Sequence, residues 1–468
     1  MTRTIEAAEL SHILDRRHSG ELEARDGDAV VLDVRPTAAY HGWCLRDEAR
    51  GGHVPGAVPF PGSWFASLSD AALQETLGAR DVMPERPVVL VGYDAGPSGD
   101  GDVHTVTARL EELGYGDVNV LAGGAQAWAA AEDLPLERLP RYRQLVHPAW
   151  LRRLLRTGEV PELGRGPWRL LHVSFDNRHD YDRGHIPGAV HLDTIAVEEP
   201  EHWNRRSPDG LRDALLERGI TRDTTVVLYG RCGRPDMSQA QPGREAGQIA
   251  AMRAAVLLMY AGVRDVRVLD GGLGAWLAAG GPVEEAETVP VPATSFGAMI
   301  PARPAYVIDL EEVREYLEDP GSVVVSMRSW AEFIGEVSGY HYIGPRGRIP
   351  GSVFGNCGSD AYHMETYRNH DNTMRDPREI EALWRAAGIT PDKRVAFYCG
   401  TGWRASEAFF YAHLLGWDRI AVYDGGWYEW SIDAGNPVET GVPAGWAGPT
   451  NPPATPPGRF RGWDAGAD

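Results

Sequence analysis

The stretch HIPGAVHL (His185 to Leu192) places a short Pro-Gly turn directly before an apolar strand, and the chain contains three versions of it. The other two are HVPGAVPF, beginning at His53, and RIPGSVFG, beginning at Arg348. Their starts are 132 and 163 residues apart (185 − 53 and 348 − 185), which is the size of a typical domain. The repetition therefore predicts one kind of domain present in three copies.

Three further blocks surround this turn in the same order in every copy. A β-branched run precedes it, and a buried-strand pattern and a Gly-Gly turn leading to tryptophan follow it. The blocks are AVVLDVR, PVVLVGYD and LAGGAQAW; RLLHVSFDNR, TVVLYGRC and LDGGLGAW; and SVVVSMRSW, RVAFYCGT and YDGGWYEW. Continuous apolar strands that alternate with amphipathic helical stretches are typical of a parallel sheet with helices on both faces. Three unrelated domains would have to reproduce this order independently, so we expect three tandem α/β domains.

Connections rich in proline and glycine mark the expected boundaries. The three domains are predicted at residues 1–140, 141–293 and 294–441. The last stretch, 442–468, contains too much proline and glycine to form regular structure. It is predicted to be either a disordered tail or an extended strap held by Trp446, Phe460 and Trp463.

Composition limits the function classes. The 468 residues contain 46 Lys and Arg against 66 Asp and Glu, a net charge of −20. Such a surface repels phosphate backbones, which argues against a nucleic-acid partner. No apolar run reaches the ~18 residues that a membrane span needs, and the N-terminal stretch has acidic residues where a secretory signal is apolar. We therefore expect a cytoplasmic protein that acts on small molecules and has no membrane partner.

Only the third copy has a cysteine where its buried strand ends. In VAFYC this residue is Cys399, whereas the same register places Gly92 and Gly230 in the first and second copies. The first two domains are therefore expected to be catalytically silent. Cys232 follows two residues too late and is a weaker second candidate for carrying sulfur.

The remaining cysteines and the histidines suggest no metal centre or disulfide framework. Cys44 and Cys357 lie in other connections, and the four cysteines show no CxxC spacing. His179, His185 and His191 have neither helical spacing nor carboxylate support for a metal. We expect no metal and no cofactor.

The loop after the third strand reads Cys399-Gly400-Thr401-Gly402-Trp403-Arg404. Two glycines allow successive backbone N–H groups to face an anion. The following helix adds the positive end of its dipole, and Arg404 adds a permanent cation. These features stabilise a thiolate or a persulfide, Cys–S–S⁻. The loop therefore predicts a reactive sulfur rather than a structural cysteine.

These turns and the cysteine at the strand end resemble the rhodanese family over roughly residues 1–440. The resemblance implies sulfurtransferase activity through a Cys399 persulfide. The layout, with the active domain last, and the sequence Y-C-G-T-G-W-R are most similar to the anaerobic bacterial ergothioneine synthases. That subfamily uses polysulfide as co-substrate and inserts sulfur into the imidazole carbon of hercynine, without oxygen or iron.

The resemblance also implies roles for individual residues. Tyr340 is the expected acid/base tyrosine and Glu332 the expected partner of an imidazole nitrogen, since the segment before the RIPGS turn is longer here than in the other copies. Tyr398 and Thr401 flank the sulfur and are expected to position polysulfide. Asp236, in the equivalent loop of the second domain, is a second candidate carboxylate or else a solvated loop residue.

Aromatic rings near the loop would hold the trimethylammonium group of hercynine. Trp403, Trp330 and Tyr342 are the candidates, with core packing as the alternative role for each. Two other functions stay open: a thiosulfate or 3-mercaptopyruvate sulfurtransferase, and a non-catalytic sulfur-carrier module. An upstream sulfur-donor protein is a further candidate partner.

Overall fold

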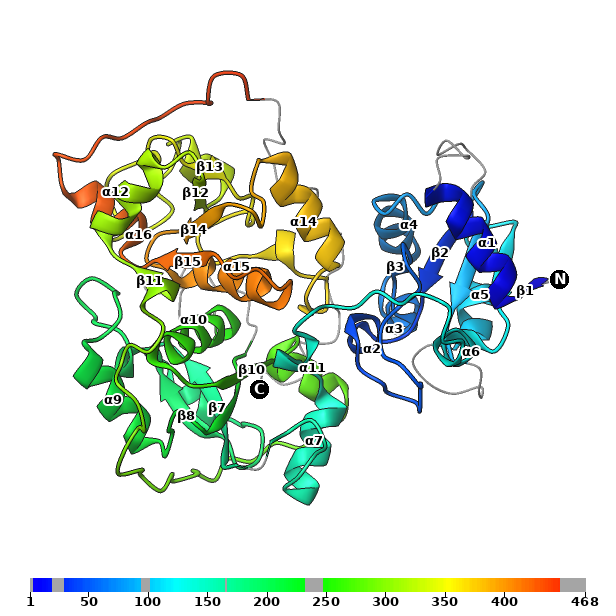
Figure 1. The fold of residues 1–468 in the computed structure, drawn as a ribbon, viewed down its shortest axis with the longest axis horizontal. Coiled ribbons are helices and arrows are strands. Elements are labelled where there is room, and N and C mark those ends of the chain that lie inside the picture. Colours follow the sequence, from blue (N-terminus) through cyan, green and yellow to red (C-terminus); the bar gives the residue numbers. More distant parts are fainter. Residues whose placement is uncertain (1–2, 19–28, 94–101, 165, 232–246, 447–468) are drawn as a thin grey trace. The chain divides into compact units, whose positions relative to one another are not determined.

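The computed structural model describes residues 3–18, 29–93, 102–164, 166–231 and 247–446. In this part of the chain each repeat forms one five-stranded parallel sheet with helices on both faces (Figure 1). The strand orders are β1-β5-β4-β2-β3, β6-β10-β9-β7-β8 and β11-β15-β14-β12-β13, which is one topology three times. The predicted fold of three tandem α/β domains is confirmed.

The first repeat forms a compact unit of its own. Its strands β2 and β4 are buried because helices cover both faces of the sheet. Ser69 and Asp102 cap α4 and α5 by accepting backbone N–H groups. Its elements are β1 (Arg3–Ile5), α1 (Ala7–His18), β2 (Val30–Asp33), α2 (Thr37–His41), β3 (Val58–Pro59), α3 (Gly62–Ser67), α4 (Asp70–Gly78), β4 (Val88–Val91), α5 (Val103–Glu112), β5 (Val118–Leu121) and α6 (Gly124–Ala130).

The second and third repeats together form the other compact unit, which begins at Arg143. In the second repeat, α7 has proline in its first turn and ends at Gly158, whose φ of +73° suits glycine. The elements of this repeat are η1 (Tyr142–Gln144), β6 (Leu145–Val146), α7 (Pro148–Thr157), β7 (Trp168–Ser174), α8 (Arg178–Asp182), β8 (Val190–Asp193), η2 (Thr194–Ala196), α9 (Pro208–Glu217), β9 (Thr225–Tyr229), α10 (Gly247–Ala261), β10 (Asp265–Leu269) and α11 (Gly272–Ala278).

The third repeat has the same order of elements. Its helix α14 begins with a proline behind the capping carboxylate of Asp376. The elements are η4 (Pro304–Tyr306), β11 (Val307–Ile308), α12 (Leu310–Glu318), β12 (Ser322–Ser326), α13 (Trp330–Phe333), β13 (Val353–Phe354), η5 (Glu365–Tyr367), α14 (Pro377–Ala386), β14 (Arg394–Tyr398), α15 (Trp403–Leu414), β15 (Ile420–Tyr423) and α16 (Gly426–Ile432).

Helices α10 and α15 pack against each other at the centre of the second unit (Figure 1). Every residue of α10 is buried, because this helix lies between its own sheet and the third repeat. The beginning of α15 carries the Cys399 loop, so this helix pair brings the second repeat against the loop.

The predicted domain boundaries fall in the connections between α6 and β6 and between α11 and β11. Of the predicted strap residues, Trp446 packs on Trp330 and Phe354, with ring centroids 5.2 and 6.0 Å apart. Phe460 and Trp463 lie outside the described residues, so the choice between tail and strap stays a prediction.

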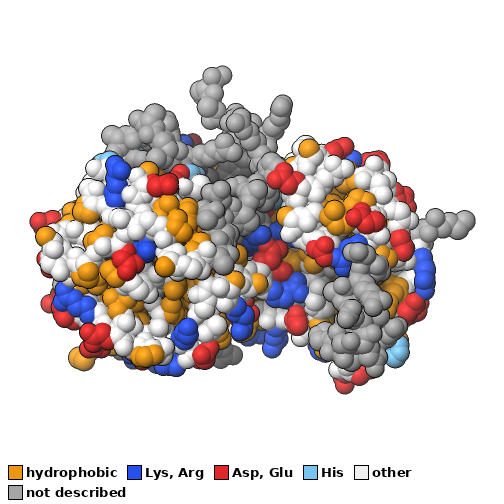
Figure 2. Space-filling model, turned by 90° about the horizontal axis from the view of Figure 1, so that it is seen from above, with side chains coloured by type: hydrophobic (Ala, Val, Ile, Leu, Met, Phe, Trp, Pro, Cys, Tyr) orange, Lys and Arg blue, Asp and Glu red, His pale blue; other side chains and the backbone are white. Residues whose placement is uncertain are grey.

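Acidic and basic side chains are interspersed on the face drawn in Figure 2, with apolar side chains between them. Among the described residues, no helix has the length and apolar character needed to cross a membrane.

Candidate active site

Cys399 follows β14 directly and lies in the turn before α15, as predicted. The residue before it anchors the strand end, since the hydroxyl of Tyr398 lies 3.0 Å from Ser352 Oγ and accepts the N–H of Ile349 at 3.4 Å. Cys399 itself is 1% exposed and lines a cavity. The strand therefore delivers the thiol to a closed and rigid position.

The Gly-Gly turn of the third repeat holds the cysteine loop from the other side. The N–H of Trp427 donates to the carbonyl of Cys399 at 2.8 Å. Gly426 has φ +56°, and a Cβ there would lie 2.6 Å from the carbonyl oxygen of Gly400. Only glycine permits this close approach, so the Gly-Gly turn and the cysteine loop are in direct backbone contact.

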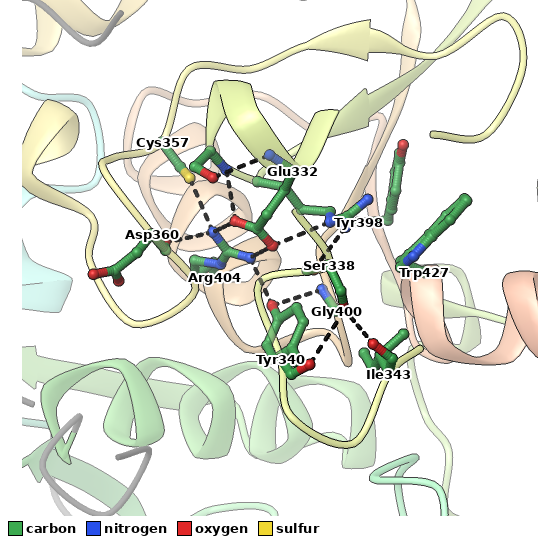
Figure 3. Close-up of polar contacts among 12 residues, drawn as sticks. Glu332, Ser338, Tyr340, Ile343, Cys357, Asp360, Tyr398, Gly400, Arg404 and Trp427 are labelled. Atoms are coloured by element: carbon green, nitrogen blue, oxygen red, sulfur yellow. Dashed lines mark hydrogen bonds and ion pairs between the residues drawn. The ribbon is translucent and has the colours of Figure 1, made fainter. Parts of the chain in front are cut away.

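Arg404 lies beneath the loop in a fully buried pair with Glu332 (Figure 3). Its Nη2 and Nη1 donate to Glu332 Oε1 and Oε2 at 2.9 and 3.0 Å. Nη1 also donates to the carbonyl of Asp360 at 2.8 Å. This forked geometry fixes the guanidinium of Arg404, which is also one of the residues lining the cavity.

A second arginine shares the same carboxylate. Arg328 Nε donates to Glu332 Oε1 at 3.2 Å, and its Nη1 donates to the carbonyl of Gly347 at 2.6 Å. Burial alone would favour the neutral acid, but Arg404 and Arg328 hold the pKa of Glu332 below its usual value. Arg328 and Arg404 carry two positive charges against the one negative charge of Glu332, so this group beneath the cysteine loop has a net positive charge.

The hydroxyl of Tyr340 joins this network to the cysteine loop. It accepts the N–H of Gly400 at 3.1 Å and Arg404 Nη2 at 2.6 Å. Burial raises the pKa of Tyr340 well above its ordinary value, so the phenol is protonated at neutral pH. With its oxygen accepting two hydrogen bonds, its proton is available to a group in the cavity. A Cβ on Gly400 would lie 2.3 Å from the Tyr340 ring, so glycine is required there.

The cavity has a volume of about 300 Å³ and mostly aromatic walls. Cys399, Thr401 and Arg404 line it together with Tyr340. The remaining lining residues of the third repeat are His341, Tyr342, Ala361, Tyr362, Trp403 and Tyr428. The second repeat supplies Phe175, Pro200, Glu201, Trp203 and Ile249. Two repeats therefore build one pocket around one thiol.

The structure brings several predicted residues together at this cavity. Cys399, Thr401, Trp403, Tyr340 and Tyr342 all line it. The ring centroids of Tyr340 and Tyr342 are 5.5 Å apart.

Three predicted substrate-binding residues lie elsewhere. Glu332 is not at the cavity wall, because Arg404 stands in front of it and occupies its oxygens. Tyr398 faces the core under the strand end rather than the cavity. Trp330 packs in a separate aromatic cluster with Phe333, Phe354 and Trp446. The pleat of β14 directs Tyr398 into the core, and α13 directs Trp330 into its own aromatic cluster, whereas Glu332 contacts the loop through Arg404. A substrate contact for any of the three residues stays a prediction.

The glycines of the loop act through the backbone. Gly400 donates its N–H to Tyr340 instead of pointing it at the sulfur as expected. Gly402 precedes α15 with φ +86°, a conformation that favours glycine. Asp236 and Cys232 lie outside the described residues.

Sequence reasoning missed the contribution of Phe175 and Trp203. The ring of Phe175 lies 5.1 Å from that of Trp203 and 5.4 Å from that of Trp403, edge to face in each case. Both belong to connections of the second repeat. Their one sequence signal was aromatic character in loops that follow sheet strands.

The other described thiols differ from Cys399. Burial raises the pKa of Cys357 to about 12, and its sulfur faces Arg404 at 3.4 Å. Cys44 is exposed in the first repeat. Among the described residues, no group of three His, Cys, Asp or Glu side chains is arranged to hold a metal ion.

Comparison with known proteins identifies the class. Residues 19–131, 147–279 and 309–433 match the model of the rhodanese-like domain. The chain therefore belongs to the rhodanese-like domain family.

Individual relatives narrow the class. The chain is 41% identical over 422 residues to thiosulfate sulfurtransferase YnjE of Escherichia coli (strain K12), which covers 90% of this chain and 91% of that protein. The wild-type structure of EanB is 44% identical, with a TM-score of 0.88, and covers 95% of this chain and 99% of EanB. Other EanB structures contain hercynine, or ergothioneine covalently linked with a persulfide cysteine.

Proposed function

We propose that the protein transfers sulfane sulfur from polysulfide to the imidazole carbon of hercynine and so makes ergothioneine. The observation that carries this is the joint placement of Cys399, Tyr340 and an aromatic wall around one cavity. EanB variants studied with these ligands replace a tyrosine and a threonine. Tyr340 and Thr401 have the same spacing from Cys399 (399 − 340 = 59 and 401 − 399 = 2) as those residues have from the EanB persulfide cysteine.

Polysulfide first loads Cys399 as a persulfide, Cys–S–S⁻. The positive loop floor, with Arg404 and the first N–H groups of α15, favours this anion. Sulfur transfer then forms one C–S bond and breaks the ring C–H bond and the S–S bond. The terminal sulfur leaves with the ring, Cys399 returns as a thiolate, and the proton from the ring carbon is released. The electrons balance without an external oxidant.

Tyr340 supplies the proton-handling group. Its protonated hydroxyl is held by Gly400 and Arg404 at the edge of the cavity. A hydroxyl fixed in the wall of the cavity that Cys399 also lines can protonate the ring nitrogen or relay the released proton. The aromatic walls suit the trimethylammonium group, because a quaternary cation has no hydrogen-bond donor and gains most from π-faces.

A thiosulfate sulfurtransferase is the competing function, supported by the likeness to YnjE. A dianionic donor needs free cations around the loop. Here Arg404 is already engaged by Glu332, and the cavity walls are largely aromatic. These features favour hercynine over thiosulfate.

The test is to incubate the protein anaerobically with polysulfide and hercynine and to quantify the thione by mass spectrometry. The matched assay supplies thiosulfate or mercaptopyruvate with cyanide as acceptor. We expect the rate of thione formation to be well above the rate of thiocyanate production. Robust thiocyanate production without thione would establish the competing function instead.

A further inference from the structure

A buried charged cluster joins the silent second repeat to the active loop. It consists of Glu198, Arg253 and Asp424, which are all fully buried. Arg253 Nε donates to Glu198 Oε1 at 2.7 Å, and its Nη2 donates to Asp424 Oδ1 at 2.5 Å. Burial raises the pKa of Glu198 to about 7, although Arg253 opposes this shift. Taking ionisable groups out of water costs several kcal/mol per ion, so such a cluster is a poor way to gain stability alone.

The cluster contacts both tryptophans of the cavity wall. Trp403 Nε1 donates to the two oxygens of Glu198, each at 3.1 Å. Arg253 Nη2 donates to the backbone carbonyl of Trp203 at 3.4 Å. Trp203 has φ +61°, a conformation unfavourable for a residue with a side chain, so the surroundings must hold it in place.

The same arginine also supports the cysteine loop. A Cβ on Gly402 would lie 3.0 Å from Arg253 Nη1, so the guanidinium packs directly against the loop backbone. Glu198 and Arg253 do not line the cavity themselves, whereas Trp403 and Trp203 do. Glu198 and Arg253 therefore act on the cavity only through the residues that line it, such as Trp203 and Trp403.

We propose that Glu198 is a positioning residue that sets the orientation of the Trp403 indole for the trimethylammonium group of the substrate, an inference that rests on the proposed function. A carboxylate on the indole N–H fixes the rotation of the ring. It also increases the electron density of the π-face that meets the cation. The second repeat, which has no thiol at the loop position, thus contributes to substrate recognition.

The test measures two steps separately in wild type, Glu198→Gln and Glu198→Asp. Hercynine KM and kcat are obtained from thione formation, and persulfide loading of Cys399 is followed by mass spectrometry with polysulfide alone. Glu198→Gln keeps the shape and an acceptor but loses the charge, and it is expected to raise hercynine KM ~10-fold. Persulfide loading should stay within ~2-fold, because no sulfur chemistry passes through Glu198.

Glu198→Asp keeps the charge balance with Arg253 and Asp424, so it guards against a folding failure of the first variant. Its carboxylate is withdrawn by one methylene from the indole, and KM should rise ~3-fold. Asp270→Asn, a buried carboxylate of the same two-repeat interface outside the cavity, is the matched control and should leave KM unchanged.

A double-mutant cycle with Trp403→Phe, which lacks the indole N–H, decides whether Glu198 acts through the ring. In that background, Glu198→Gln should change KM less than ~2-fold. An equal effect in both backgrounds, or a parallel loss of loading and thiolation, would overturn the positioning role. If wild type makes no thione at all, the proposed function fails first, which is a different result from thione formation that ignores Glu198.

Discussion

Two aspartates, Asp270 and Asp424, open the Gly-Gly turns of the second and third repeats and lie buried between these repeats. Each accepts a backbone N–H from the opposite repeat: Asp270 from Met374 at 2.8 Å and Asp424 from Arg205 at 2.9 Å. Their charged surroundings differ. Burial opposes ionisation of both, but Arg253 and Arg205 hold the pKa of Asp424 below its usual value. Burial raises the pKa of Asp270 to about 7.

One pair of matching helix positions in the two repeats carries opposite charges. Arg253 in α10 and Glu407 in α15 are separated by the same 154 residues (407 − 253) as the aspartates (424 − 270). Arg253 pairs with Asp424 beside the cavity, whereas Glu407 pairs with Arg368 at the other end. The two repeats share one backbone arrangement, but the aspartate on the side of Cys399, Asp424, is the one that pairs with two arginines, Arg205 and Arg253. At the thiol end the second repeat supplies part of the cavity wall.

The largest effect should come from the thiol itself. Cys399→Ser removes the only sulfur at the described cavity, and thione formation should fall more than ~10³-fold. The product is measured by mass spectrometry after incubation with polysulfide and hercynine. Cys44→Ser, in the first repeat, is the control and should retain full activity. Equal losses in the two variants would contradict the division of labour between repeats.

The second largest effect should come from removing the carboxylate of Asp424, the aspartate on the side of Cys399. Asp424→Asn leaves the buried guanidinium of Arg253 with one partner fewer and removes an ion pair from Arg205. We expect destabilisation of ~3–5 kcal/mol, measured as a shift of the urea midpoint of the unit formed by the second and third repeats. A neutral effect would mean that the arginines do not depend on this aspartate.

Tyr340→Phe separates proton handling from sulfur loading. The variant keeps the ring but loses the hydroxyl that accepts from Gly400 and Arg404. Thione formation should fall ~100-fold, as for loss of a general acid or base. Persulfide on Cys399, followed by mass spectrometry without hercynine, should form at an unchanged rate. A matching fall in loading would assign Tyr340 to the first step instead.

The smallest effect has the opposite sign. Asp270→Asn keeps an acceptor for the Met374 N–H and removes a carboxylate that burial disfavours. Since the folded pKa of about 7 lies above the unfolded value, wild-type stability falls as pH rises from about 4 to about 7. The asparagine variant should therefore be more stable by ~1–2 kcal/mol at pH 8, with a smaller gain at pH 5. Thermal unfolding at the two pH values measures this. If the asparagine variant were less stable than wild type at pH 8, Asp270 would stabilise the fold as a carboxylate, as Asp424 does, and the contrast between the two aspartates would fail.

The repeated motifs predicted the backbone well because each motif corresponds to a contact. Gly426 lies against Gly400, so the Gly-Gly motif in the sequence predicts where the cysteine loop packs. Strand register then identified Cys399 as the thiol at the sheet edge. These features follow from local chain geometry, which a single sequence contains.

The side-chain network could not be predicted in the same way. Glu332 was expected at the substrate, but it bridges Arg328 and Arg404, because its helix directs it beneath the loop. Phe175 and Trp203 reach the cavity only because α10 packs on α15. That packing depends on the folded shapes of two repeats, which no motif in either one encodes.

In the proposed reaction, a persulfide on Cys399 is the immediate source of the sulfur. Protein loaded with polysulfide, freed of excess donor and mixed anaerobically with hercynine, tests it in a single turnover. We expect up to one thione per loaded site, with loss of the persulfide from the Cys399 peptide at the same rate. Persistence of the persulfide without thione, or thione formed only when free polysulfide is restored, would contradict it.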